Sequence, residues 1–162
     1  MELLLRRVLF ISLFAWLPLL LLSVISGHAL GGVIKIPFLR DIEAHARFLV
    51  ALPMLITAEL IVHLRIRPAV SKFVERNLIV PEEMPKFRAA IDSVTRLRNS
   101  IGLEVGMLVS VYTLGHWFWR SQVAIGEATW YATPRETHLH LTLAGYWYAF
   151  VSVPLFQFIL LR

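Results

Sequence analysis

The chain has 162 residues, of which 57% are hydrophobic, and a formal net charge of +5. It contains no cysteine, which excludes disulfides, thiolate metal sites and thiol nucleophiles. The basic residues lie beside long apolar runs, which is the pattern of membrane topology, so we expect a lipid bilayer as the partner and no nucleic acid.

Four apolar runs dominate the chain, at residues 8–26, 48–64, 101–119 and 139–161. Each is about long enough to cross a hydrocarbon core of roughly 30 Å. Stretches of these runs are apolar nearly all round, whereas a helix of a soluble protein carries a single apolar stripe. The sequence therefore predicts an all-α integral membrane bundle of four transmembrane helices in a single membrane domain over residues 1–162.

The first run resembles a signal peptide at its start, where Arg6 and Arg7 precede it. It is about 19 residues long, however, and the apolar core of a signal peptide has roughly 7–15. This length favours an uncleaved first span. Because the chain stops as the fourth run ends, we also expect it to be the amino-terminal part of a longer protein.

Lysine and arginine are distributed unevenly between the two sides of these spans. Eleven fall on the side of the amino terminus and five on the other side. The positive-inside rule then predicts that both termini and the loop 65–100 are cytoplasmic. Loops 27–47 and 120–138 are predicted to face outward.

The loop 65–100 contains an amphipathic segment. Apolar residues recur in it at helical spacing, and Glu82, Glu83 and Pro85 are typical of a first helical turn. We predict a helix over residues 83–99. It either lies on the inner leaflet, where its basic residues would meet anionic lipid, or extends the third span into the cytoplasm.

Two carboxylates lie inside predicted spans, where an ionisable group marks either function or buried pairing. Glu59, His63 and Arg67 are spaced four residues apart and share one helix face, and Glu104 lies about one turn into the third span. The stripe is either a proton or cation path, or a structural contact of Glu59 with a neighbouring helix.

The third span also has a face of small residues. Gly102, Gly106 and Ser110 follow the small-xxx-small spacing that lets helix backbones approach closely. This face predicts a helix contact, either within the chain, between copies in a homo-oligomer, or with another membrane protein. In the fourth span the triplet Tyr146-Trp147-Tyr148 is expected to pack between helices, where its hydroxyls need partners.

Histidines are concentrated on the predicted outward side, among them His116, His138 and His140. Imidazole is a common ligand of transition metals and of haem, so these three residues are possible ligands. The alternative is that they only pack at the membrane interface, which suits a ring with a polar edge. The sequence contains no Walker loop, GxSxG, HExxH or GxGxxG motif, so nothing in it predicts an enzyme.

Three segments resemble a group of uncharacterised bacterial multi-pass inner-membrane proteins. They are residues 44–59 (AHARFLVALPMLITAE), 81–87 (PEEMPKF) and 96–100 (RLRNS). The resemblance implies a location in the bacterial cytoplasmic membrane and no particular activity. Together these features predict a non-enzymatic assembly, scaffold or sensor component. Proton or ion conduction through Glu59 and His63, or a redox subunit with outward histidine ligands, are the alternatives.

Overall fold

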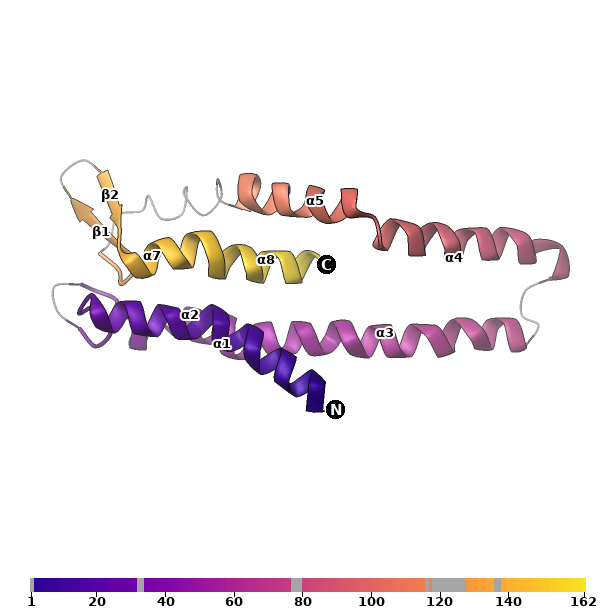
Figure 1. Ribbon diagram of the computed structural model, residues 1–162, viewed down its shortest axis with the longest axis horizontal. Helices are drawn as coiled ribbons and strands as arrows, with labels where there is room; N and C mark the ends of the chain where they lie inside the picture. The colour runs from indigo at the N-terminus through magenta and orange to yellow at the C-terminus, as the bar shows by residue number, and fades with distance from the viewer. Residues whose placement is uncertain (1, 32–33, 77–79, 116, 118–127, 136–137) are drawn as a thin grey trace.

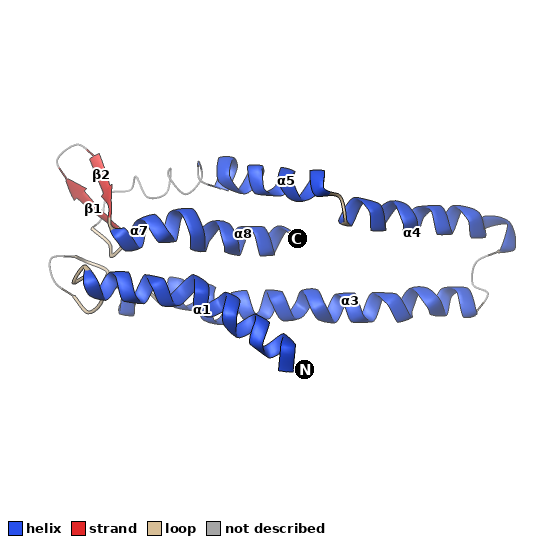
Figure 2. Ribbon diagram, in the orientation of Figure 1, coloured by secondary structure: helices blue, strands red, loops and turns tan. Residues whose placement is uncertain are grey.

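The computed structural model describes residues 2–31, 34–76, 80–115, 117, 128–135 and 138–162. It is mostly helical, with one short β-hairpin at one end (Figures 1 and 2). Three helices are long and apolar enough to cross a membrane, over Leu4–Ile25, Ile42–Val62 and Leu143–Leu161. The predicted run 101–119 contains the shorter apolar helix Ile101–Gly115, and residues 116, 118 and 119 of that run lie outside the described part.

The elements follow one another along the chain with few long connections. In order they are α1 (Glu2–Ile25), η1 (Phe38–Arg40), α2 (Ile42–His45), η2 (Ala46–Ala51), α3 (Leu52–Glu75), η3 (Pro81–Glu83), α4 (Met84–Arg98), α5 (Ile101–Ser110), η4 (Val111–Gly115), β1 (Ala132–Arg135), β2 (His138–Leu141), α7 (Leu143–Trp147), η5 (Tyr148–Ser152) and α8 (Val153–Leu161). The segments η1 and η3 are 3-10 turns, and η2, η4 and η5 are π-helical.

Helix α1 is apolar on every side, yet only one side of it is buried by the protein. Ala15, Leu19 and Ser23 are fully buried on that side, while Phe10 and Ile25 on the others remain 71% and 75% exposed. Ser152 of η5 donates a hydrogen bond to the Ala15 carbonyl, at 2.7 Å, so α1 and η5 approach closely at this small residue. Exposed apolar surface of this extent is what a lipid-facing helix presents.

Elements α2, η2 and α3 form one helical run from Ile42 to Glu75, which is longer than the predicted span 48–64. Residues 65–75, which we expected in a loop, continue α3, with Pro68 inside the helix. A proline in a helix interior removes one backbone donor and can bend the helix without ending it. The helix predicted over residues 83–99 is present as α4.

Two of the π-helical segments, η2 and η5, are separated from a following proline by a single residue. The N–H of Leu52 donates to the carbonyl of Arg47, just before Pro53, and the N–H of Val153 donates to that of Tyr148, just before Pro154. Proline cannot donate the next hydrogen bond of an α-helix, so the preceding turn widens to five-residue spacing. Both wide turns belong to helices that meet at the hairpin end of the bundle.

The β-hairpin corrects the all-α prediction in one place. Strand β1 pairs antiparallel with β2, from Ala132 opposite Leu141 to Arg135 opposite His138. The fourth apolar run was expected to be helical from residue 139, but the helix begins at Leu143. The reason is local: the hydroxyl of Thr142 accepts a hydrogen bond from the Gly145 N–H at 3.0 Å and caps the first turn of α7.

The core lies between α1, η2, α7 and η5, close to the hairpin. Its largest fully buried side chains include Trp130, Phe38, Phe48 and Leu52. Both chain termini lie at the other end of these helices, and the second half of α3 and all of α4 project beyond the termini (Figure 1).

Candidate functional site

Glu59, which was predicted to lie within the second span, is on α3 and faces the end of α8. Its Oε1 atom is 3.4 Å from the Nε of Arg162, and the two side chains are 43% and 44% exposed. Glu59 therefore has a charged partner at the end of another helix. The side chains of His63 and Arg67 lie outside the described part, so the remainder of the predicted stripe is placed only by its helical backbone.

Elements α5 and η4 form one helix, which packs against α8. In the described part of the chain its contacts lie on one side. In η4 this side carries Val111, which is buried, Tyr112, whose hydroxyl donates to the Phe150 carbonyl of η5 at 3.0 Å, and Gly115. A Cβ atom at Gly115 would collide with the side chain of Gln157, so the backbone of η4 lies directly on that residue. Glu104, half-buried, lies on this same side of the helix.

The predicted small face lies on the opposite side of α5. Gly102 and Gly106 are exposed and Ser110 is half-buried. Among the residues that the structure describes, a Cβ at Gly106 would meet nothing within 4 Å, and one at Gly102 only the Ser100 hydroxyl at 3.5 Å. Within the described part of the chain, this face is therefore open.

The predicted histidine ligands are only partly described. His140 lies on β2, is exposed and pairs across the hairpin with Thr133. His138 lies opposite Arg135, its side chain lies outside the described part, and so does the whole of His116. Among the described residues no group of three or more His, Asp or Glu side chains is placed to hold a metal ion.

A cluster of polar and aromatic side chains, which we did not predict from the sequence, lies at the hairpin end. We call it the polar–aromatic cluster. It is defined by Trp16, Phe38, Asp41, Glu43, His45, Arg47, Trp130 and Tyr148. Its members come from α1, from the turn and helix that precede α3, from the segment before β1, and from η5. It therefore connects α1, α2, η2 and η5.

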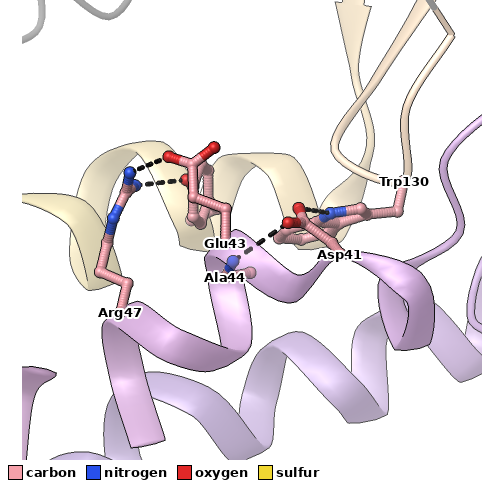
Figure 3. A network of polar contacts seen from close by, with 6 residues as sticks. Asp41, Glu43, Ala44, Arg47 and Trp130 are labelled. Carbon is pink, nitrogen blue, oxygen red and sulfur yellow. Dashed lines mark hydrogen bonds and ion pairs between the residues drawn. The ribbon is translucent and has the colours of Figure 1, made fainter. Parts of the chain in front are cut away.

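Asp41 organises one half of the polar–aromatic cluster (Figure 3). One carboxylate oxygen accepts from the Ala44 N–H at 3.0 Å, which caps α2, and the other accepts from the indole N–H of Trp130 at 2.7 Å. Trp130 is fully buried, and its ring packs edge-on against Phe38 at 4.8 Å between centroids. One side chain thus fixes both the start of a helix and the position of the loop that follows residue 127.

Arg47 organises the other half (Figure 3). Its guanidinium donates to the Tyr148 hydroxyl at 2.7 Å, forms an ion pair with Glu43, and lies over the ring of Phe156 at 5.8 Å. The charge is therefore balanced by a carboxylate and by an aromatic face. Of the triplet that was expected to pack between helices, Tyr148 is buried and its hydroxyl has a partner, whereas Tyr146 is 53% exposed.

A third contact ties α1 to the same cluster. The indole N–H of Trp16 donates to Nδ1 of His45 at 2.9 Å, and the His45 ring packs edge-on against Phe38 at 5.0 Å. Beside it, burial raises the pKa of the Tyr131 hydroxyl, outweighing the lowering effect of a hydrogen bond with Thr129. That hydroxyl therefore stays neutral at physiological pH.

The polar groups of the cluster hydrogen-bond to one another, and these bonds hold the surrounding helices together. The indole donors, the carboxylate of Asp41 and the guanidinium each have partners within the chain. Satisfied networks of this kind rigidify a core and specify its arrangement. The sequence signal that could have found it is the start of the second helical run, where Asp41, His45 and Phe48 share one helix face next to Arg47.

Comparison with known proteins adds no functional assignment: no family model, curated protein or solved structure matches this chain.

Proposed function

We propose that this chain is a non-enzymatic component of a membrane assembly, which associates through contacts between spanning helices. In this proposal the protein crosses a bacterial cytoplasmic membrane four times, and α5 belongs to the third span. Both termini and the segment between α3 and α5 are cytoplasmic, in agreement with the excess of lysine and arginine on that side. The placement of both termini at one end of the helices supports this topology (Figure 1).

The observation that carries the proposal is the one-sided packing of the helix formed by α5 and η4. The side that bears Tyr112 and Gly115 in η4 lies against η5 and α8, whereas the side that bears Gly102 and Gly106 in α5 is open in the described part of the chain. Apolar burial does not drive helices together in lipid, so association depends on close backbone approach. Glycine at two positions one turn apart permits that approach, and a second spanning helix would fill the open side.

Disulfide cross-linking tests this proposal directly, because the chain contains no cysteine of its own. We expect Ser110→Cys on the open side to yield a covalent dimer in native membranes under mild oxidation. Leu13→Cys on the exposed side of α1 is the matched control and should yield much less. Adding Gly106→Leu to Ser110→Cys should abolish the cross-link, because the larger side chain keeps the backbones apart.

Association with a different membrane protein is detected by the size of the native complex after extraction in mild detergent. In that case Gly106→Leu should reduce the size of the complex, and Val24→Leu on the exposed side of α1 should leave it unchanged. If Ser110→Cys does not cross-link and Gly106→Leu leaves the complex size unchanged, the proposal is wrong.

A further inference from the structure

The segment between the membrane helices forms a projecting structure, which we call the helical arm and define as residues 65–98. It consists of the second half of α3 and of α4, and it extends past the end of the bundle at which both termini lie (Figure 1). Helix α4 continues in nearly the same direction as α5, so it runs along the spans and not across them (Figure 1). A helix that binds in the plane of the lipid surface would lie across them.

The helical arm carries most of the net charge of the protein. Residues 65–100 contain eight lysines and arginines and four acidic residues, which accounts for four of the five net positive charges. The side chains that the structure describes are exposed: Arg65, Lys72, Arg76, Lys86, Arg88 and Arg96. Such a surface attracts a negatively charged partner.

An apolar seam runs along α4. Phe87, Ala90, Val94 and Leu97 are spaced three, four and three residues apart, which is the spacing of the core positions of a coiled coil. Val94 and Leu97 are 67% and 61% exposed. Together with Ala90 and Phe87 they form a contiguous apolar stripe outside the apolar bundle, which is the kind of surface that marks a contact with a partner.

The charges beside this seam indicate what covers it. Lys86 and Arg98 occupy two of the flanking positions of the heptad, the uncharged Ile91 and Ser93 occupy two others, and the acidic residue Asp92 falls on the far side of the helix. Flanking positions select the partner by opposite charge. A second copy of this arm is a poor partner, because the two net-positive surfaces would repel each other.

We infer that α4 binds an amphipathic helix of a partner protein, with acidic residues beside its own apolar seam, on the surface formed by Phe87, Ala90, Val94 and Leu97. This surface is separate from the open side of α5. Partner binding by α4 and association through α5 can therefore be tested independently. In the assembled protein the open side would act within the membrane and the helical arm would bind a partner outside it.

The test uses the full chain in nanodiscs of zwitterionic lipid and two synthetic fluorescent peptides of three heptads. Both peptides carry leucine at the core positions, and one carries glutamate and the other lysine at every flanking position. By fluorescence anisotropy we expect the glutamate peptide to bind at least tenfold more tightly than the lysine peptide. Raising the salt concentration should reduce this preference, because exposed charges are screened.

Variants of the full chain locate the binding surface. The double substitution Val94→Ser, Leu97→Ser should weaken binding of the glutamate peptide at least tenfold, and both positions are exposed, so folding should be unaffected. Leu30→Ser, at a position 78% exposed on the hairpin side, is the control and should bind as the unaltered chain does. Gly106→Leu should also leave peptide binding unchanged, since it alters only the open side of α5.

Three results would overturn the inference. The first is equal binding of the two peptides, and the second is no measurable binding of either. The third concerns protection of the helical arm from proteolysis. It is protection in nanodiscs that contain anionic lipid, combined with no protection by the glutamate peptide in zwitterionic nanodiscs. That third result would assign α4 to the membrane surface.

Discussion

Arg47 donates to the hydroxyl of Tyr148 at 2.7 Å across 101 positions of the chain, and each residue lies in a π-helical segment that precedes a proline. The wide turns before Pro53 and Pro154 therefore belong to the same contact between helices. Short π-helical segments are rare and are frequently found at functional positions. Here they lie at the point where the second and last apolar helices are joined.

The Tyr148 hydroxyl should contribute measurably to stability. Tyr148→Phe deletes the acceptor and leaves the buried part of the Arg47 guanidinium with fewer partners, so we expect a loss of about 1–3 kcal/mol. Thermal unfolding in detergent, followed by intrinsic fluorescence or calorimetry, measures this. Tyr146→Phe removes the same group from a residue that is 53% exposed and should change the melting temperature little. Equal effects of the two substitutions would show that the contact with Arg47 is not stabilising.

Asp41 should contribute to the stability of the fold through two separate hydrogen bonds. Asp41→Ala removes the cap of α2, a contribution of about 1 kcal/mol, and leaves the buried Trp130 indole N–H without this acceptor, at about 1–3 kcal/mol. We therefore expect a lower melting temperature together with a change in tryptophan emission. Asp92→Ala, on the exposed surface of α4, is the matched control. An unchanged emission spectrum in Asp41→Ala would contradict the hydrogen bond to Trp130.

Two glycines should respond in opposite ways to the same substitution. At Gly145 an added Cβ would collide with the backbone carbonyl of Tyr131, which cannot rotate away, so Gly145→Ala should destabilise the fold by about 1–3 kcal/mol. At Gly106 the added methyl would meet no described atom within 4 Å, so Gly106→Ala should leave the stability of the monomer unchanged or raised. Unfolding of the detergent-solubilised monomer measures both. Similar losses would mean that Gly106 is packed within the chain.

Glu59 provides a test of proton conduction. Its pairing with Arg162 is partly exposed, so Glu59→Gln should change stability by less than about 1 kcal/mol. Because the carboxylate has a partner at the end of α8, we expect liposomes that contain the unaltered protein to show no proton flux above empty liposomes. A pH-sensitive dye inside the liposomes measures this. A flux that Glu59→Gln abolishes would establish the conducting role in place of the assembly role.

The membrane helices could be predicted from the sequence because length and hydropathy are properties of contiguous residues. Three of the four apolar runs correspond to helices long enough to span, the run 101–119 contains a shorter apolar helix, and the amphipathic pattern of residues 83–99 corresponds to α4. Helix ends were predicted less well. The continuation of α3 to Glu75 and the start of α7 at Leu143 depend on local backbone bonds that hydropathy does not register.

The sequence by itself determined that these helices suit a lipid environment. Long apolar runs favour lipid whichever residues they contact in the folded protein. It also determined the basic composition of the helical arm and the small face of α5. Only the tertiary structure decided which side of α5 is occupied, and that Asp41 and Trp130, or Arg47 and Tyr148, are partners. Those pairs are separated by 89 and 101 positions, and no local pattern specifies a contact between residues so far apart in the chain.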